Sequence, residues 1–312
     1  MSIALTLGQT ALELGLICSL TVLALFLSYS MLNVCDLSTD GCFTLGAAVG
    51  AVVAISGHPY LSIFAAMAAG MCSGFITALL QTRMGIDSLL AGIIVNTGLY
   101  SVNIAIMGGS SLLNMNKTET VFTKMKSLLK GVSLTDYSIL FVSLIAVTLI
   151  VVFLTAFLNT RLGKAIRATG NNPDMVKSSS IDPAFTTTVG LCVSNAFTGL
   201  SGCLLAQSQK SVDINIGTGM LTVALASLLI GGAVLGKGSI LLRAVGVVLG
   251  AIIFRLVYTI ALRFHMPAFM LKLVSSIIVI LAISIPYLKK QWPTIKRYMD
   301  AKRLKKTEEK DA

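Results

Sequence analysis

The stretch 231-GGAVLGKGS-239 comes closer to a catalytic motif than any other part of the chain. It nearly matches G-x-x-x-x-G-K-[S/T], the loop whose backbone amides and lysine hold nucleotide phosphates. Gly231, Gly236 and Lys237 are in place, but Gly238 stands where the Mg²⁺-binding hydroxyl belongs. The stretch also ends an apolar run, not a strand of a soluble α/β domain. It is typical of a turn between membrane helices, so we expect no ATP hydrolysis by this chain.

No other group of side chains suits catalysis or metal binding. The two histidines, His58 and His265, each lie near a proline at an expected loop, and no nucleophile is paired with a base. The cysteines occur singly, without a C-x-x-C pair, which favours small thiols buried in helix packing. They are Cys18, Cys35, Cys42, Cys72, Cys192 and Cys203. We therefore predict no cofactor and no metal in this chain.

A few polar residues lie inside the apolar runs. Glu13 is near the edge of the first run and Arg255 is well inside another. A charge buried in a membrane is costly, so Arg255 either faces a functional path or forms a structural ion pair. Asn96, Asn103 and Asn195 either line a polar path or make helix–helix hydrogen bonds. The chain has no series of carboxylates and histidines like that of proton-driven carriers, which argues against ion coupling.

Composition indicates what must position these residues. The chain has 312 residues, of which 55% are hydrophobic and 12% charged, and its mean hydropathy is +0.87. A soluble domain would carry about twice that charged fraction. Apolar runs near the length that crosses ~30 Å of hydrocarbon recur throughout. We predict an all-α, polytopic membrane protein with eight or nine transmembrane helices.

The expected spans follow the apolar runs. They are 9–32, 60–82, 87–107, 137–158, 184–206, 220–236, 240–262 and 268–288. A further run, 42–56, is too short for a confident span, and we expect a short tilted helix or a re-entrant one there.

Basic residues set the expected orientation. The tail 289–312 holds nine of the 24 Lys and Arg residues and contributes +5 to the net charge of +11, and it directly follows the membrane domain 1–288. Such a tail is typical of a cytoplasmic anchor attracted to anionic lipid, and does not indicate nucleic acid. Placing this tail and the loop 159–183 in the cytoplasm puts most basic residues inside, although the loop 108–136 carries four lysines outside. The amino terminus is outside if 42–56 spans, and inside if it is re-entrant.

The loop 159–183 is unusually polar for this chain, and its spacing predicts two short helices. Leu162, Ala165 and Ile166 fall at i, i+3 and i+4, on a single helical face. The basic residues Arg161, Lys164 and Arg167 fall on another face.

Capping residues divide this loop. Gly170 suits a helix end, where a positive φ is needed. Asn172, Pro173 and Asp174 suit the first turn of a second helix as N-cap, N1 residue and dipole partner. The segment therefore either lies on the lipid surface as an amphipathic element or docks a cytoplasmic partner.

Two Gly-rich stretches resemble one another, 45-LGAAVGAVVAI-55 and 245-VGVVLGAIIFR-255. Each carries a small-xxx-small pattern that lets helix backbones approach closely. The likeness is compatible with an internal structural repeat and equally with chance.

The loop also carries a family resemblance. TRLGKAIRATGNNPDMV, followed by 181-IDP and the apolar run 190–206, resembles permeases of bacterial ABC importers of the branched-chain amino acid/ribose type. Their loop typically reads T-x-x-G-x-A-x-R-A-x-G-x-N-P. The segments 40–51 and 225–240 are similar to that family's early Gly-rich segment and its G-G-x-x-x-G-G-x-G-S turn, with Lys237 in place of Gly. The resemblance covers about residues 10–288 and is nearest to permeases paired with tryptophan/tyrosine-type binding proteins.

The resemblance implies a multi-pass subunit of an importer in the bacterial plasma membrane, with its carboxyl terminus in the cytoplasm. Expected partners are a second permease chain, two cytoplasmic ATPase subunits that bind ATP and Mg²⁺, and an extracytoplasmic solute-binding lipoprotein. The solute would be small, an amino acid and in particular an aromatic one. An ion-coupled carrier and a non-transporting membrane scaffold are the rival interpretations.

The resemblance further implies that the loop 159–183 is the element that couples the permease to the ATPase. Residues that match the family motif are Gly163, Ala165, Arg167, Ala168, Gly170, Asn172 and Pro173, and Arg161, Lys164 and Asp174 complete the predicted coupling surface. ATP-driven closure of the partners would switch the cavity between outward and inward access. The N-terminal ends of any broken helices near 40–46 would face the pathway.

Overall fold

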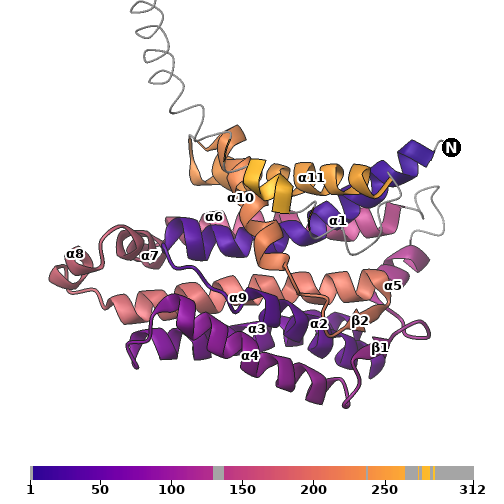
Figure 1. The fold of residues 1–312 in the computed structure, drawn as a ribbon, viewed down its shortest axis with the longest axis horizontal. Coiled ribbons are helices and arrows are strands. Elements are labelled where there is room, and N and C mark those ends of the chain that lie inside the picture. Colours follow the sequence, from indigo (N-terminus) through magenta and orange to yellow (C-terminus); the bar gives the residue numbers. More distant parts are fainter. Residues whose placement is uncertain are drawn as a thin grey trace, which may run out of the picture.

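The structure, a computed structural model, describes residues 3–128, 137–236, 238–263, 273, 276–281 and 284. These residues form a helical bundle (Figure 1). In chain order the elements are α1 (Ile3–Leu25), the π-helical stretch η1 (Phe26–Met31), α2 (Thr39–Ile55), α3 (Pro59–Thr82), α4 (Ser88–Ile106), β1 (Leu112–Asn114), α5 (Val121–Leu128), α6 (Ser138–Asn159), α7 (Arg161–Asn171), α8 (Pro173–Ser178), α9 (Pro183–Gln209), β2 (Ser211–Asp213), α10 (Met220–Leu235) and α11 (Ile240–Arg263).

The prediction of an all-α polytopic membrane protein is confirmed. Six stretches in the described part of the chain are helical, apolar and long enough to cross a bilayer. They are Leu7–Met31, Pro59–Thr82, Ser88–Ile106, Ser138–Asn159, Pro183–Gln209 and Ile240–Ala261. The predicted span 268–288 falls largely outside the described residues, and the tail 289–312 falls wholly outside them.

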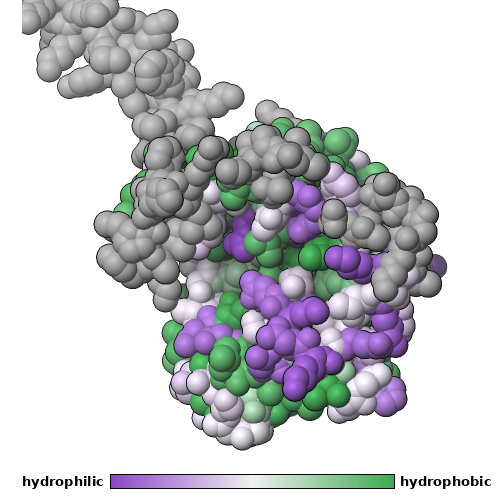
Figure 2. All heavy atoms as spheres, turned by 90° about the vertical axis from the view of Figure 1, so that its right-hand side faces the viewer, coloured by the Kyte–Doolittle hydropathy of each residue, from purple (hydrophilic) through white to green (hydrophobic). Residues whose placement is uncertain are grey.

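The long helices run between two distinct ends of the molecule (Figure 1). We call the end that carries α7 and α8 the α7 end. The opposite end, the strand end, carries α5, the amino terminus and the antiparallel pair β1–β2, in which Leu113 faces Val212. Seen end-on, the strand end gathers hydrophilic side chains on its face (Figure 2). The strand end is therefore a polar cap on an apolar bundle, as a membrane-spanning protein requires.

Helix α9 is the centre of the bundle. It packs against α1, α2 and α3, and 83% of its apolar window is buried inside the protein. Small residues make this possible, because a Cβ added at Gly199 would meet the Ala66 carbonyl at 2.5 Å. A Cβ at Gly74 would likewise meet the Leu191 carbonyl at 2.5 Å. Without a hydrophobic drive between helices in lipid, such close backbone contact supplies much of the packing energy.

Both Gly-rich stretches that resemble each other lie at close helix crossings. Gly46 and Gly50 in α2 press against α9, where an added Cβ would overlap Gly199 and Cys203. In α11, a Cβ on Gly250 would overlap the backbone of α10. The expected close approach is confirmed at both stretches, and an internal repeat stays a prediction.

Helix α2 settles the uncertainty over residues 42–56. The chain leaves Met31 at the α7 end, runs without helix to Asp36, and there contacts Asn195 near the middle of α9. The helix then begins at Thr39 and continues toward the strand end, where its alanines pack with Val212. Residues 32–55 thus cross the bundle in two parts, a non-helical segment followed by α2. Neither of the two alternatives, a tilted helix or a re-entrant one, included this arrangement. It places the amino terminus at the strand end (Figure 1).

Helix α10 revises the predicted span 220–236. It has 16 residues, fewer than a full crossing needs, and its first turn lies against Asp40 of α2. The non-helical segment 214–219 leads down to it from β2 at the strand end. Two half-helices, α2 and α10, therefore begin next to each other in the interior of the bundle.

A valine at Gly46 should loosen the bundle. Its side chain would overlap the Gly199 backbone, which cannot move without displacing α9, so we expect a loss of about 1–3 kcal/mol. The matched control is Gly8→Val in α1, because a Cβ there has nothing within 4 Å. Thermal unfolding of the detergent-solubilised protein should show a lower midpoint for Gly46→Val only. Equal midpoints for the two variants would mean that the α2–α9 contact is not tight.

Candidate functional site

Helix α7 is anchored to the bundle by its apolar face, as its spacing predicted. The Thr160 hydroxyl caps its start by accepting from the Gly163 amide at 3.1 Å. Ile166 is fully buried, and the Thr169 hydroxyl lies 2.8 Å from that of Thr186 in α9. Leu162 is half-buried on the same face. The helix is therefore fixed to the first turn of α9 by apolar and polar contacts together.

The expected role of Gly170 as a helix end was wrong. Gly170 lies inside α7, which continues to Asn171, and its φ is not positive. A Cβ there would overlap the Met31 carbonyl and the backbone of Leu32. Glycine is needed because α7 rests directly on the chain at the end of η1, a tertiary contact that local capping rules do not detect.

Helix α8 begins as expected. The Asn172 side-chain oxygen accepts from the amides of Asp174 and Met175, both at 3.1 Å. Pro173 fills the first helical position, and Lys177 lies 3.8 Å from the Asp174 carboxylate in an exposed pair. Only Val176 of this short helix is buried.

One face of α7 and α8 is left open at the α7 end of the protein (Figure 1). The predicted residues Arg161, Lys164, Asn172, Pro173 and Asp174 are exposed on it, whereas Ala165, Arg167, Ala168 and Gly170 are half-buried and Gly163 is buried in the turn from α6. Met175 is 65% exposed. We keep the name coupling surface, after the predicted role, for the face formed by the exposed and half-buried residues among these. It combines the basic charges of Arg161 and Lys164 with the protruding apolar side chain of Met175.

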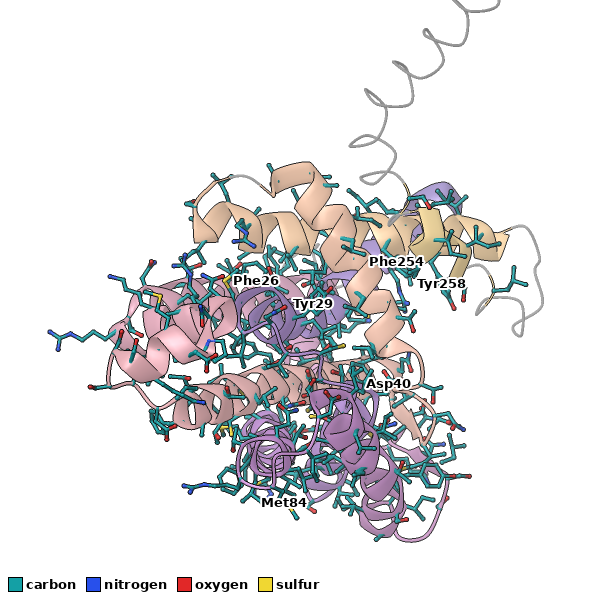
Figure 3. The ribbon with its side chains drawn as sticks, turned by 60° about the vertical axis from the view of Figure 1, so that its left-hand side comes forward. Phe26, Tyr29, Asp40, Met84, Phe254 and Tyr258 are labelled. Carbon is teal, nitrogen blue, oxygen red and sulfur yellow. The ribbon has the colours of Figure 1, made fainter. Side chains whose placement is uncertain are left out.

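The junction of the two half-helices forms a second polar region. Asp40, in the first turn of α2, accepts from the amides of Gly219 and Leu221 at 2.8 Å each. The carboxylate therefore caps the start of α10 across 179 residues of sequence (Figure 3). A negative charge is favourable here, because the positive ends of two helix dipoles converge on it.

A cavity of about 420 Å³ opens beside this junction. Its lining comes from the start of α2, from α4 and from the segment before α10, and consists of Asp40, Gly41, Thr44, Asn96, Thr97, Tyr100, Ser101, Asn103, Ile214, Asn215 and Thr218. Asn96 and Asn103, both predicted path residues, are brought together here. The start of α2 borders this polar cavity, and the expectation that helix starts near 40–46 face the pathway stays a prediction.

Asn195 lies outside this cavity, and its side-chain amide nitrogen is hydrogen-bonded within the protein. Its amide donates to the Asp36 carboxylate at 2.7 Å and to the Leu191 carbonyl at 3.3 Å. The other oxygen of Asp36 accepts from the amide and hydroxyl of Ser38 at 2.8 and 2.6 Å. Asp36 and Asn195 are each 1% exposed. The bond to Asp36 joins α9 to the non-helical segment before α2, so it is structural but does not link two helices, and a role for Asn195 in the path stays a prediction.

Arg255 also lies outside the cavity. It is half-buried on α11, and its guanidinium lies 5.2 Å from the centre of the Tyr258 ring. Its Nε has no hydrogen-bond partner, and it forms no ion pair with Glu13, which accepts from Gln9 instead. The predicted structural ion pair is therefore absent from the described residues, and a role for Arg255 in the path stays a prediction.

Sequence reasoning missed Asp36, Asp40 and Gln207. Gln207 joins three elements, donating to the Ser62 hydroxyl at 2.7 Å and accepting from the Val121 amide at 2.9 Å. Both aspartates precede the short apolar run 42–56, and two acids just before a run too short to span would have been a usable signal.

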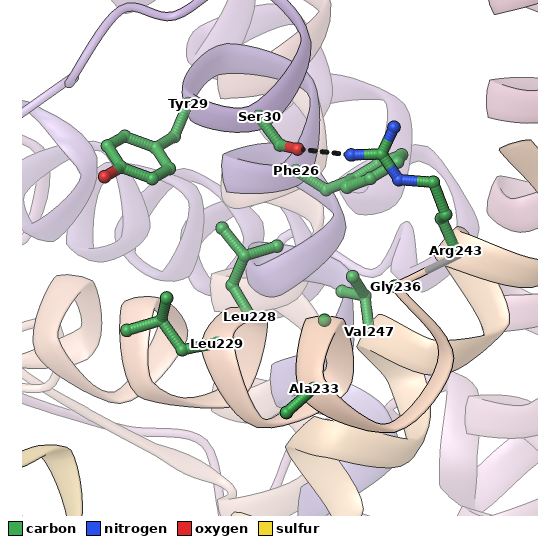
Figure 4. A pocket seen from close by; sticks show the side chains of 10 residues that line it. Phe26, Tyr29, Ser30, Leu228, Leu229, Ala233, Gly236, Arg243 and Val247 are labelled. Atoms are coloured by element: carbon green, nitrogen blue, oxygen red, sulfur yellow. Dashed lines mark hydrogen bonds between the residues drawn. The ribbon is translucent and has the colours of Figure 1, made fainter. Parts of the chain in front are cut away.

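The near P-loop 231–239 connects α10 to α11, and so joins two helices as expected. Beside it, residues of η1, α10 and α11 enclose a second cavity of about 350 Å³ (Figure 4). Arg243 donates to the Ser30 hydroxyl at 3.0 Å and lies 5.4 Å from the centre of the Phe26 ring. The guanidinium holds η1 to the first turn of α11, which is a structural role.

Six apolar helices long enough to span a bilayer, with two half-helices that meet beside a polar cavity, define a multi-pass membrane protein. The chain belongs to the family described as branched-chain amino acid transport system, permease component, whose model matches residues 9–283. It is therefore a transport component and not an enzyme.

Relatives agree with this assignment. The chain is 31% identical to a tyrosine transport system permease protein of Clostridioides difficile (strain R20291), over 85% of this chain and 86% of the relative. It is 34% identical to an uncharacterized protein of Rickettsia prowazekii (strain Madrid E), over 71% and 75%. A probable branched-chain amino acid transport permease protein, LivH, of Methanocaldococcus jannaschii is 28% identical over 70% of this chain and 63% of the relative. No solved structure shows significant similarity.

The bond between Asp36 and Asn195 should be strongly coupled. Alanine at either position leaves a buried polar partner unsatisfied, so the double variant should lose less stability than the sum of the single ones. We expect a coupling energy of about 1.5–3 kcal/mol from unfolding measurements. Pairing Asn195→Ala with Ser143→Ala serves as the control, because the Ser143 hydroxyl bonds within α6. Additive losses for Asp36 and Asn195 would show that their hydrogen bond contributes nothing to stability.

Proposed function

We propose that this chain is the transmembrane subunit of an ATP-binding cassette importer that moves an amino acid into the cytoplasm. The observation that carries the proposal is the coupling surface, which is firmly anchored on one side and open on the other. ATP and Mg²⁺ would be bound by separate ATPase subunits that dock on it. The α7 end would then lie in the cytoplasm and the strand end outside.

The coupling surface has the chemistry of a docking site. It presents Arg161 and Lys164 with their charges in solvent, and Met175 supplies an apolar contact beside them. Anchoring apolar side chains within a charged rim is the usual anatomy of a protein interface. The excess of basic residues favours an acidic groove on the partner.

Motion of the coupling surface can reach the polar cavity through packed elements. Thr169 and Gly170 contact the first turn of α9 and the end of η1, respectively. Helix α9 then carries Asn195, which holds Asp36 just before α2 begins. A push on α7 by closing ATPase subunits would thus act on the half-helix junction, which is the element that we propose switches between outward and inward access.

A second permease chain would complete the path. Thr97, Tyr100 and Ser101 are exposed polar residues in the middle of a spanning helix, α4. Polar groups are rarely directed at lipid, so this face is better suited to another protein chain or to water. We therefore place the homodimer contact and the solute path on the α4 side. The solute-binding lipoprotein would deliver its cargo at the strand end.

The proposed solute is an amino acid with an aromatic side chain. Support comes from the family description and from the relative named as a tyrosine transport permease. The cavity of about 420 Å³ lies within the range of small-ligand sites, ~300–1,000 Å³.

Charge reversal at Arg167 should uncouple the chain from its ATPase. We expect Arg167→Glu to weaken co-purification of the ATPase subunits by at least about tenfold and to reduce uptake of labelled tyrosine to the same extent. The matched control is Lys126→Glu, an exposed charge on α5 at the strand end, which should leave co-purification unchanged.

Gly170→Val tests the same surface by disrupting the contact between α7 and the end of η1, which holds α7 in place. The side chain would overlap the Met31 and Leu32 backbone and displace α7 from its seat, so uptake should fall while the protein remains in the membrane. Normal uptake in both the Gly170 and Arg167 variants would disprove the coupling role. Uptake that continues without any ATPase and stops with an uncoupler would instead identify an ion-coupled carrier.

A further inference from the structure

The cavity beside the half-helix junction is rich in hydrogen-bond acceptors. Thr44 and Thr97 use their hydroxyl protons within their own helices, donating to the carbonyls of Asp40 and Ile93 at 3.1 and 2.9 Å. Their oxygens therefore keep lone pairs for the cavity. Each carboxylate oxygen of Asp40 accepts one backbone amide and has room for a further donor.

Asn103 supplies an acceptor that the described part of the chain leaves unused. Its side chain is 1% exposed, and its amide nitrogen donates to the Gly41 carbonyl at 3.2 Å. That bond fixes which end of the amide is the oxygen, and this Oδ1 has no hydrogen-bond partner among the described residues. Leaving such a buried acceptor unpaired costs about 1–3 kcal/mol, so an unpaired one lining a cavity indicates a missing donor.

Charge selects which donor fits. Of the residues that line the cavity, Asp40 is the only charged one, and no lysine, arginine or histidine is among them. The dipoles of α2 and α10 offset part of the Asp40 charge but add no mobile positive group. A positively charged ligand group with several N–H donors can donate to both Asn103 and Asp40. A ligand carboxylate would instead be repelled by the negative charge of Asp40, which no basic lining residue offsets.

We propose that this cavity recognises the ammonium group of the amino acid in transit, with Asp40, Asn103, Thr44 and Thr97 as its acceptors. The proposal rests on the proposed function, because it identifies the end of the solute that the permease itself reads. Selection by charge inside the membrane would exclude deaminated acids of the same shape, whatever the binding protein delivers.

The test uses the full chain purified alone in detergent, so that it is independent of ATPase and binding protein. The probes are tyramine, which keeps the ammonium group and lacks the carboxylate, and 3-(4-hydroxyphenyl)propanoate, which keeps the carboxylate and lacks the ammonium group. We expect saturating tyramine to raise the unfolding midpoint by about 2–4 °C and the acid to leave it unchanged. Sodium chloride, compared with choline chloride at equal ionic strength, tests for a bare cation.

Two variants at one position isolate the acceptor. Asn103→Leu removes it and should abolish the tyramine shift, whereas Asn103→Asp lacks the same amide but keeps an oxygen and should retain the shift. If Asn103→Leu does not fold, Thr97→Val, on the exposed face of α4, should at least halve the shift.

Equal shifts with both probes, a shift with sodium alone, or an unchanged tyramine shift in Asn103→Leu would each overturn the proposal. A tyramine shift together with uptake that ignores the ATPase would uphold the ammonium site and refute the importer. ATPase-dependent uptake without a tyramine shift would do the reverse.

Discussion

The structure depends on satisfying backbone amides that begin inside the bundle. A helix start leaves up to four N–H groups unpaired, and a bilayer offers no water to pair them. Helix α10 starts in the interior, and the Asp40 carboxylate takes two of its first amides. Because Asp40 itself belongs to the first turn of α2, one side chain fixes two half-helices against each other. The same carboxylate lines the cavity, so this contact, the cavity and the starts of both half-helices lie together.

Small residues allow the helices around this junction to pack closely. Helix α9 brings glycines to its contacts with α2 and α3, and a side chain at several of these positions would overlap a neighbouring backbone. Tight packing around α9 also explains how a polar pair such as Asp36 and Asn195 is tolerated at 1% exposure each. Burying a carboxylate is costly unless hydrogen bonds compensate, and three donors from Ser38 and Asn195 do so.

Much of the fold could be predicted from local sequence patterns, and the predictions that failed share one cause. Hydropathy located the long spans, and the i, i+3, i+4 spacing with the Asn172 cap predicted α7 and α8. Gly170 was misjudged because its need for glycine comes from η1, far away in sequence. The run 220–236 was taken as a span because its apolar character does not reveal that the sixteen-residue helix α10 starts inside the bundle. Asp36 and Asp40 have partners at separations of 159 and 179 residues, which a single sequence does not show.

Those separations also impose an order on assembly. When the ribosome has made residues 32–40, Asp36 has only the donors of the nearby Ser38, and Asp40 lacks its partners at the start of α10. Asn195 and the first turn of α10 are synthesised only after α3 to α6. Helix α2 therefore gains the distant hydrogen-bond partners of Asp36 and Asp40 only after the helices that follow it have been made. A chain truncated before Gly219 would lack the Gly219 and Leu221 amides from which the Asp40 carboxylate accepts.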